Sequence, residues 1–180
     1  MADASVRPAT PGDADELARI QAAVWAGVHG GDLPEDLLGA VGSTEAAERW
    51  RTAIAEPPSP RHRVLTALAG EQVVGFAALA PAADPDTIAS LDGELLALCV
   101  DPAAAGHGHG SRLVNAVADV AREDGVHHLH AWLATAETEL RAFLAGAGWA
   151  EDGATRSLDL RGDGAVQVEQ TRLRTALVDL

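Results

Sequence analysis

Several residue types are scarce in this sequence, and each scarcity argues against a kind of structure or binding partner. The 180 residues include no tyrosine, one cysteine and two phenylalanines, and 13 basic residues stand against 27 acidic ones. Cys99 alone cannot form an intrachain disulfide framework. The net charge of −14 opposes binding to nucleic acid or anionic membranes, because their phosphates require basic surfaces. An acidic surface would attract a cationic substrate, although a solvated face that aids solubility is the simpler explanation.

Long apolar runs are also missing. No stretch approaches the roughly 18 apolar residues of a membrane-spanning helix. The first five residues contain an acid and no apolar core, so no signal peptide is expected. With 47% apolar residues, the chain is predicted to form one domain over residues 1–180 with its own core. A cytoplasmic protein without membrane partners is the expectation.

The hydrophobic pattern predicts alternating strands and helices. Strands are expected at residues 5–9, 64–68, 73–79, 94–100, 128–133, 154–160 and 166–177, and helices at 10–30, 43–56, 108–124 and 137–147. The strand at 94–100 is nearly continuous in apolar residues, which is typical of burial on both faces. The order predicts a mixed α/β domain. Its central strand–helix–strand unit predicts parallel neighbours joined by a right-handed crossover.

Three alternating glycines, Gly106, Gly108 and Gly110, precede the amphipathic helix at 108–124. Glycine allows close approach to a ligand, and a helix N-terminus offers free N–H groups, so the segment suits a phosphate. A dinucleotide fingerprint would need glycine where Ser111 stands, and a nucleotide-triphosphate loop would need Gly-Lys-Ser/Thr. A purely structural turn remains the alternative.

The surroundings of this loop carry a resemblance. Val100-Asp101-Pro102, then three residues, then Gly-x-Gly-x-Gly-Ser-x-Leu resembles the acetyl-coenzyme A motif of the GNAT superfamily of N-acetyltransferases. Gly-Glu-Gln-Val-Val-Gly-Phe at 70–76 looks like the family's hairpin. Gly-Glu-Leu at 93–95 is similar to one bacterial subgroup, and residues 143–149 resemble the family's Phe-Tyr-x-x-x-Gly-Phe/Trp segment. The resemblance spans residues 6–177.

The resemblance implies the GNAT fold and its co-substrate. The fold is a mostly antiparallel sheet with flanking helices and a splay between parallel strands at 94–100 and 128–133. Acetyl-coenzyme A, or another acyl-coenzyme A, would place its pantetheine arm in the splay and its pyrophosphate on the loop amides. The implied binding residues are Leu98, Cys99, Val100, Ala105, Gly106, His107, Gly108, His109, Gly110, Ser111, Glu137, Leu140 and Leu144.

Three of these positions depart from the family pattern. Ala105 stands where the family has arginine or glutamine, and Glu137 where it often has asparagine. Leu144 stands where it has the tyrosine that acts as general acid for the leaving thiolate. Two alternatives to acetyl transfer follow: a catalytically impaired acyl-coenzyme A sensor or interaction protein, and a transferase for a longer acyl group, which apolar Leu140 and Leu144 would suit.

Glu94 is the predicted general base for an amine acceptor. A carboxylate partly buried at the head of the cofactor strand would have a raised pKa, although an exposed strand-edge acid is an equal alternative. Asp92 is the nearby substitute. The backbone N–H of Cys99 or Val100 is the predicted oxyanion donor. The Cys99 thiol itself is expected to be a small buried apolar group, which favours direct transfer.

The resemblance also implies an acceptor pocket, lined by Trp25 and Trp132, for a small-molecule or peptide amine. Glu35 and Asp36 are further candidates to contact the amine, with solvated surface as the simpler interpretation. The superfamily often forms dimers, so a homodimer is possible. No metal is expected, because no zinc-ligand spacing occurs among the five clustered histidines, His107, His109, His127, His128 and His130.

Overall fold

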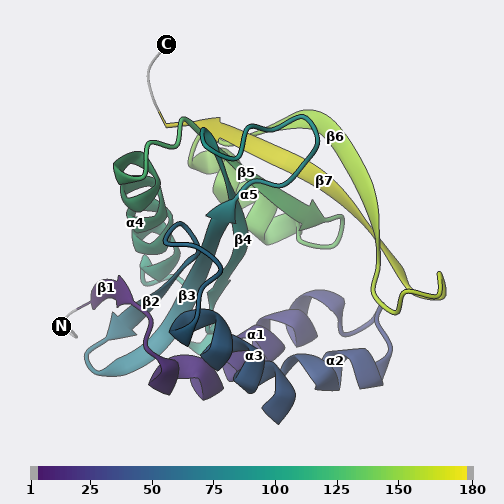
Figure 1. Cartoon of the computed structure of the whole chain (residues 1–180). Helices are drawn as coiled ribbons and strands as arrows, with labels where there is room; N and C mark the ends of the chain where they lie inside the picture. The colour runs from purple at the N-terminus through teal and green to yellow at the C-terminus, as the bar shows by residue number, and fades with distance from the viewer. Residues whose placement is uncertain (1–3, 178–180) are drawn as a thin grey trace.

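The computed structural model describes residues 4–177 and arranges them around one seven-stranded sheet (Figure 1). The strand order is β1-β2-β3-β4-β5-β7-β6, and every neighbouring pair is antiparallel except β4 and β5. The strands are β1 (Ala4–Pro8), β2 (Arg63–Ala69), β3 (Gln72–Pro81), β4 (Asp92–Val100), β5 (His128–Ala134), β6 (Ala150–Asp159) and β7 (Gln167–Ala176). The predicted mixed sheet with parallel central strands is confirmed.

Helices cover both faces of this sheet (Figure 1). The helices are α1 (Ala14–His29), α2 (Glu35–Val41), α3 (Thr44–Ala55), α4 (His109–Glu123) and α5 (Thr138–Gly146), with short 3-10 turns at Pro11–Asp13 and Pro102–Ala104. Within residues 4–177, no helix has the length and apolar character needed to cross a bilayer.

Two apolar clusters hold the layers together. On one face, α4 and α5 bury Leu113 and Leu144 against the central strands. On the other face, α1 buries Leu17 and Ile20 against Phe76 of β3. The central strands therefore have a helix layer on each side, which explains their apolar character.

The helix starts follow local signals in the sequence. The Ser43 hydroxyl accepts a hydrogen bond from the Ala46 N–H at 3.1 Å and caps α3. Ahead of α1, the Thr10 N–H donates to the Asp13 carboxylate at 2.7 Å. Helix α2 was not predicted, because its seven residues have no buried position and thus no amphipathic pattern.

Two further expectations needed correction. Strand β6 begins at Ala150 rather than at residue 154, and a register shift interrupts its pairing with β7 between Glu151 and Thr155. Strand β4 is not buried on both faces throughout, since Leu96 is 57% exposed. Leu96 lies at a bulge: Ala78 of β3 pairs with Ala97 and the next residue, Leu79, pairs with Leu95. Leu96 therefore has no partner on β3.

Candidate functional site

A gap opens between the two parallel strands at the centre of the sheet. Strands β4 and β5 pair at three positions only, ending with Glu94 opposite His130. Beyond this point β4 continues to Val100 and β5 to Ala134 without pairing to each other. The facing backbone edges are therefore free over the second half of both strands.

The first edge of the gap belongs to β4. The opposite edge of β4 pairs with β3, where the Asp101 N–H donates to the Val74 carbonyl at 2.8 Å. In an antiparallel pair of strands, every second pair of opposed residues is joined by backbone hydrogen bonds. Val74 lies opposite Asp101, so Phe76 and Cys99, two positions along, form the next hydrogen-bonded pair. The Cys99 carbonyl indeed lies against Gly75, where an added Cβ would be 2.9 Å from its oxygen. The Cys99 N–H is therefore committed to the sheet.

The amides of Leu98 and Val100 consequently point away from β3 and into the gap. Of the two predicted oxyanion donors, this arrangement leaves Val100 available and adds Leu98. Leu96, at the bulge just before them, presents its side chain to solvent. A ligand chain in the gap would therefore meet two free N–H groups.

The second edge belongs to β5. The Thr135 N–H donates to the Glu169 carbonyl of the neighbouring chain segment at 3.1 Å. By the same alternation, the backbone groups of Trp132 and Ala134 face β4. The Ala134 N–H donates to Oε2 of Glu137 at 2.6 Å. The Glu137 carboxylate therefore lies on the gap side of β5.

The glycine loop connects β4 to α4 at the open end of the gap. Gly106 and Gly108 have φ values of 78° and 80°, a left-handed conformation that favours glycine. Gly108 is the N-cap of α4, so the amides of His109, Gly110 and Ser111 lie in its first turn and have no acceptor within the helix. The loop thus has the free donors and the helix dipole that a phosphate requires.

Two side chains lie beside these free amides. The Arg112 guanidinium donates to the His107 carbonyl at 2.9 Å and lies over Gly108, 3.1 Å from the position of an added Cβ. It places a positive charge beside the loop, which Ala105 cannot provide. No sequence signal identified it, because Arg112 follows the glycines instead of preceding them.

His109 is the second of these side chains. It is only 5% exposed, and its Nδ1 has no hydrogen-bond partner among the described residues. Burial, with the nearby charges of Arg112 and His107, lowers its pKa, so the ring is neutral. A neutral ring with an unsatisfied nitrogen beside the free amides fits a phosphate-bearing ligand.

Glu94 occupies the closed end of the gap. Its carboxylate is half-buried, and burial raises the pKa, while the charge of Arg156 opposes the rise and that of Asp84 adds to it. Arg172 also lowers the pKa. None of the hydrogen bonds among residues 4–177 engages this carboxylate. Glu94 is thus a partly desolvated carboxylate without a hydrogen-bond partner among the described residues.

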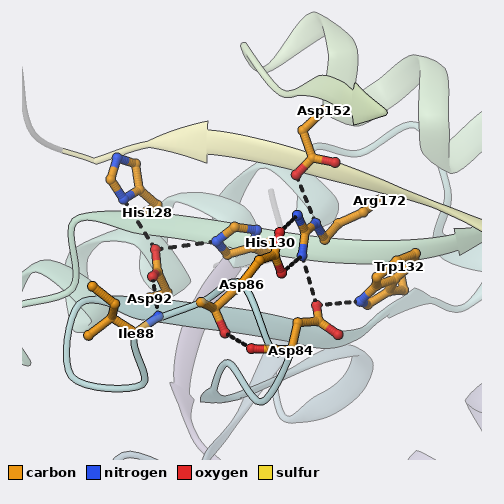
Figure 2. Close-up of polar contacts among 10 residues, drawn as sticks. Asp84, Asp86, Ile88, Asp92, His128, His130, Trp132, Asp152 and Arg172 are labelled. Atoms are coloured by element: carbon orange, nitrogen blue, oxygen red, sulfur yellow. Dashed lines mark hydrogen bonds and ion pairs between the residues drawn. The ribbon is translucent and has the colours of Figure 1, made fainter. Parts of the chain in front are cut away.

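A charge cluster fixes the chain beside Glu94. Figure 2 shows the Arg172 guanidinium surrounded by three carboxylates. It donates to Asp86 at 2.5 Å, to Asp152 at 2.8 Å and to Asp84 at 3.1 Å. The Trp132 indole N–H donates to Asp84 at 2.9 Å (Figure 2). These contacts hold the β3–β4 connection against β5 and β7, an interaction that sequence spacing did not reveal.

Asp92, the predicted substitute base, is engaged elsewhere (Figure 2). Its carboxylate accepts the Ile88 N–H at 2.7 Å and lies 3.2 Å from His128 Nδ1 and 3.3 Å from His130 Nε2. Burial works to raise its pKa, but the Ile88 amide and His130 hold it below its ordinary value. Asp92 therefore acts as a structural acceptor, whereas the Glu94 carboxylate has no such partner among the described residues.

The side chains of Cys99 and Leu144 are buried, so neither is placed to react with a ligand. Burial, aided by the charge of Glu137, raises the pKa of the Cys99 thiol to about 12, so a thiolate nucleophile is disfavoured. Leu144 is 0% exposed and belongs to the core beneath α4, while Leu140 packs at the edge of that core.

A cavity of about 670 Å³ adjoins the open end of β5. Its walls are His29 of α1, residues 32–34, residues 134–136 at the end of β5, and residues 165–169, which lead into β7. Trp25 lies behind this wall, with its ring centroid 5.3 Å from that of His29, and lines a second hollow beside α3. Trp132 lies on the sheet beneath Arg156, 4.3 Å from the ring centroid.

The remaining predicted residues fall outside the gap. Asp36 forms a salt bridge with Arg161 of the β6–β7 hairpin at 2.8 Å, and Glu35 begins α2 on the surface. In the part of the chain that the structure describes, no group of three or more histidine, cysteine or acidic side chains is arranged to hold a metal ion.

Comparison with known proteins was made at three levels. The family model described as "Acetyltransferase (GNAT) family" matches residues 32–149. A comparison with curated proteins found no match. Among solved structures, PaiA N-acetyltransferase from Thermoplasma acidophilum, in complex with coenzyme A, has a TM-score of 0.76 at 16% identity, covering 97% of this chain and 99% of that chain.

Two other solved structures give the same result. YncA from Salmonella typhimurium, solved with acetyl-coenzyme A, has a TM-score of 0.70 at 17% identity, covering 99% of this chain and 96% of that chain. An acetyltransferase from Thermus thermophilus has a TM-score of 0.64 at 22% identity and covers 96% of each chain. At such identities the likeness concerns the fold.

Proposed function

The chain belongs to the GNAT acetyltransferase family, and from this premise we propose that it moves an acetyl group from acetyl-coenzyme A directly to a primary amine. The observation that carries the proposal is the position of Glu94: a half-buried, unengaged carboxylate at the closed end of a gap whose backbone edges are free. A base at this point faces the region where a ligand in the gap must end.

The residues around the gap fit an acyl-coenzyme A. The first-turn amides of α4, with Arg112 and His109, would hold the pyrophosphate at the open end. The amides of Leu98 and Val100 would pair with the pantetheine arm, as strands pair with an added peptide edge. Such a ligand would supply a thioester, whose carbonyl carbon reacts with amines.

Glu94 would accept the proton that the amine must lose, directly or through one water. Its raised pKa makes it a stronger base than an ordinary carboxylate. A free amide on β4, at Leu98 or Val100, would stabilise the charge that develops on the carbonyl oxygen. The net acidity of the chain favours an acceptor that carries positive charge.

The test is thiol release from acetyl-coenzyme A against a panel of small amines and peptides, with Glu94→Gln as the variant. Loss of a general base lowers the rate by roughly 10²- to 10⁴-fold. Glu71→Gln, in the exposed β2–β3 turn, is the matched control and should keep wild-type activity. Tight binding of acetyl-coenzyme A without turnover of any amine would contradict the proposal.

A second candidate function is acyl-coenzyme A binding without transfer. The core position of Leu144 favours it, because the family's acid is absent there and the side chain is fully buried. A third is transfer of a longer acyl group, which the exposed Leu96 beside the gap would accommodate. Binding of acetyl-coenzyme A without thiol release would favour the second function, and competition among acyl-coenzyme A esters of increasing chain length separates the third from acetyl transfer.

A further inference from the structure

Two guanidinium groups lie over the indole ring of Trp132, and they differ in their partners. The Arg172 guanidinium is 5.5 Å from the ring centroid and is held by three carboxylates (Figure 2). The Arg156 guanidinium is 4.3 Å from the centroid and forms none of the salt bridges found among residues 4–177. We propose that Arg156 binds a carboxylate of the acceptor, so that the acceptor is a free amino acid. This inference rests on the proposed acetyl transfer and names its acceptor class.

Glu94 and Trp132 lie on the face of the sheet opposite to α4. Their neighbours in sequence, Leu95 and Leu133, belong to the core that α4 covers, and successive side chains of a strand alternate between faces. Trp132 is two residues beyond His130, the partner of Glu94, so about 7 Å of strand separates it from that pair. The Trp132 ring is thus part of the surface beside the proposed base.

Arg156 reaches this surface from the edge strand β6. It is opposite Gln170 of β7, which is opposite Ala134 of β5, so its side chain extends across β7 to lie over Trp132. Its Nε donates to Oε1 of Gln170 at 2.7 Å. The ring on one side and the amide on another therefore fix the position of the guanidinium.

The terminal nitrogens of this guanidinium are available to a ligand. Gln170 uses Nε, and no hydrogen bond within residues 4–177 engages Nη1 or Nη2 of Arg156. Paired N–H groups of this kind match the two oxygens of a carboxylate. Acidic residues outnumber basic ones 27 to 13, so a half-buried arginine without an acid beside it is an exception, which a carboxylate ligand would explain.

The charge of Arg156 also acts on Glu94, although no hydrogen bond joins the two side chains. Burial raises the pKa of Glu94, and among the surrounding charges Arg156 has the largest effect and lowers it. The next two charges, Asp84 and Arg172, bond to each other at 3.1 Å. Glu94 and Arg156 are therefore an unpaired anion and cation in one place. They match the ammonium group and the carboxylate of an amino acid.

The neighbouring cavity is suited to an acceptor of this size. Ala134, which follows Trp132 by two residues and shares its face, lines the cavity of about 670 Å³ together with His29 of α1. Pockets for small molecules have volumes of roughly 300–1,000 Å³. The side chain of the amino acid would lie toward this cavity while its charged groups meet Arg156 and Glu94.

The first experiment compares the common free amino acids, as acceptors, with their α-carboxamides. Thiol release is measured on the pH plateau of each variant, because Arg156 also affects the pKa of Glu94. The wild type should use the best free acid at least about tenfold better than its amide in kcat/KM. Arg156→Met should raise KM for the acid roughly 10- to 100-fold and leave KM for the amide unchanged, because it removes only a charge-assisted contact.

Two further variants are controls. Arg156→Lys keeps the charge but not the paired N–H groups, so it should keep part of the preference. Arg122→Met removes an exposed charge from α4, on the other face of the sheet, and should keep the full preference. The ratio of acid to amide is taken within each variant, so a partly misfolded protein does not change it. An unchanged ratio in Arg156→Met, or better use of dipeptides than of every free amino acid, would overturn the proposal.

The second experiment measures binding and needs no turnover. Calorimetry compares N-acetyl amino acids with their N-acetyl amides, on protein saturated with coenzyme A. Neither compound has a titratable amine, so only the carboxylate differs. The dissociation constant of the acid should be at least about tenfold lower than that of the amide in the wild type and equal to it in Arg156→Met. Equal affinities in the wild type would overturn the carboxylate site.

The two experiments keep the proposals separate. Selective binding of acids that depends on Arg156, with no turnover of any amine by the wild type, would overturn acetyl transfer and keep the carboxylate site. Turnover of amines with equal use of free acids and amides would overturn the carboxylate site alone.

Discussion

Glu94 and His130 are the last residues at which β4 and β5 pair, and the two strands diverge immediately beyond them. The base therefore sits at the vertex of the gap instead of along its sides. Any ligand that occupies the free edges from the glycine loop inward must end near this carboxylate. The Glu94–His130 pair thus marks the end of the gap that lies opposite the glycine loop.

The charges around Glu94 predict opposite pH shifts for two variants. Arg156 lowers the pKa of Glu94 and Asp84 raises it. A general base is active when ionised, so the rate falls as pH drops below its pKa. Arg156→Gln should raise that pKa and move the low-pH limb of kcat/KM to higher pH, whereas Asp84→Asn should move it to lower pH. Shifts in the same direction, or none, would show that Glu94 does not control the limb.

Much of this arrangement was predictable from the sequence, for a physical reason. The glycines at Gly106 and Gly108 mark a turn that few other residues adopt, and a helix follows directly, so local chemistry alone predicts a tight turn at a helix start. The parallel pairing of β4 and β5 follows from a strand–helix–strand order. Both features depend on neighbouring residues in the chain.

What the sequence did not reveal depends on distant residues. The bulge at Leu96 arises from pairing with β3, and the same pairing commits the Cys99 amide to the sheet. The contacts of Arg172 join it to Asp84 and Asp86, 88 and 86 positions away in the chain. Long-range contacts of this kind leave no local periodicity from which they could be inferred.

Arg172 is predicted to contribute strongly to stability. Its side chain is 6% exposed, and it neutralises Asp84 and Asp152, whose side chains are 16% and 19% exposed. Arg172→Met would leave these carboxylates without a partner, at a cost of about 3–5 kcal/mol in the free energy of unfolding. Arg174→Met, exposed on the same strand, is the control and should cost under about 0.5 kcal/mol. Urea titrations measure both, and equal losses would contradict the role.

Arg112 is predicted to strengthen coenzyme A binding. Its guanidinium lies over Gly108 and the free amides of α4, where a phosphate group would bind. Arg112→Met should raise the dissociation constant of coenzyme A by roughly 10- to 100-fold, since one charge-assisted contact is worth roughly 1.5–3 kcal/mol. Calorimetry at two salt concentrations should also show a weaker salt dependence. Arg49→Met, exposed on α3, should bind as the wild type does.

Tyrosine at position 144 is predicted to destabilise the fold without increasing the rate. Leu144 is fully enclosed by the core that includes Leu113 and Trp149. Leu144→Tyr adds volume and a hydroxyl there, which costs about 1–3 kcal/mol. Leu144→Met conserves the volume and should cost less than about 1.5 kcal/mol. A faster Leu144→Tyr enzyme of unchanged stability would show that this position still reaches the gap.

The salt bridge between Arg161 and Asp36 is predicted to affect the acceptor and not the cofactor. It joins the β6–β7 hairpin to α2, and the cavity of about 670 Å³ beside β5 is lined by residues 165–166 of this hairpin and by Pro34, directly before α2. Both side chains are exposed, so Arg161→Ala should cost less than about 1 kcal/mol in stability. Loss of the contact frees the hairpin to move away from α2, which should raise KM for the amine several-fold while the dissociation constant of coenzyme A stays unchanged. If the amine enters elsewhere, the variant will keep the wild-type KM, and a parallel change in both constants would indicate a general loss of structure.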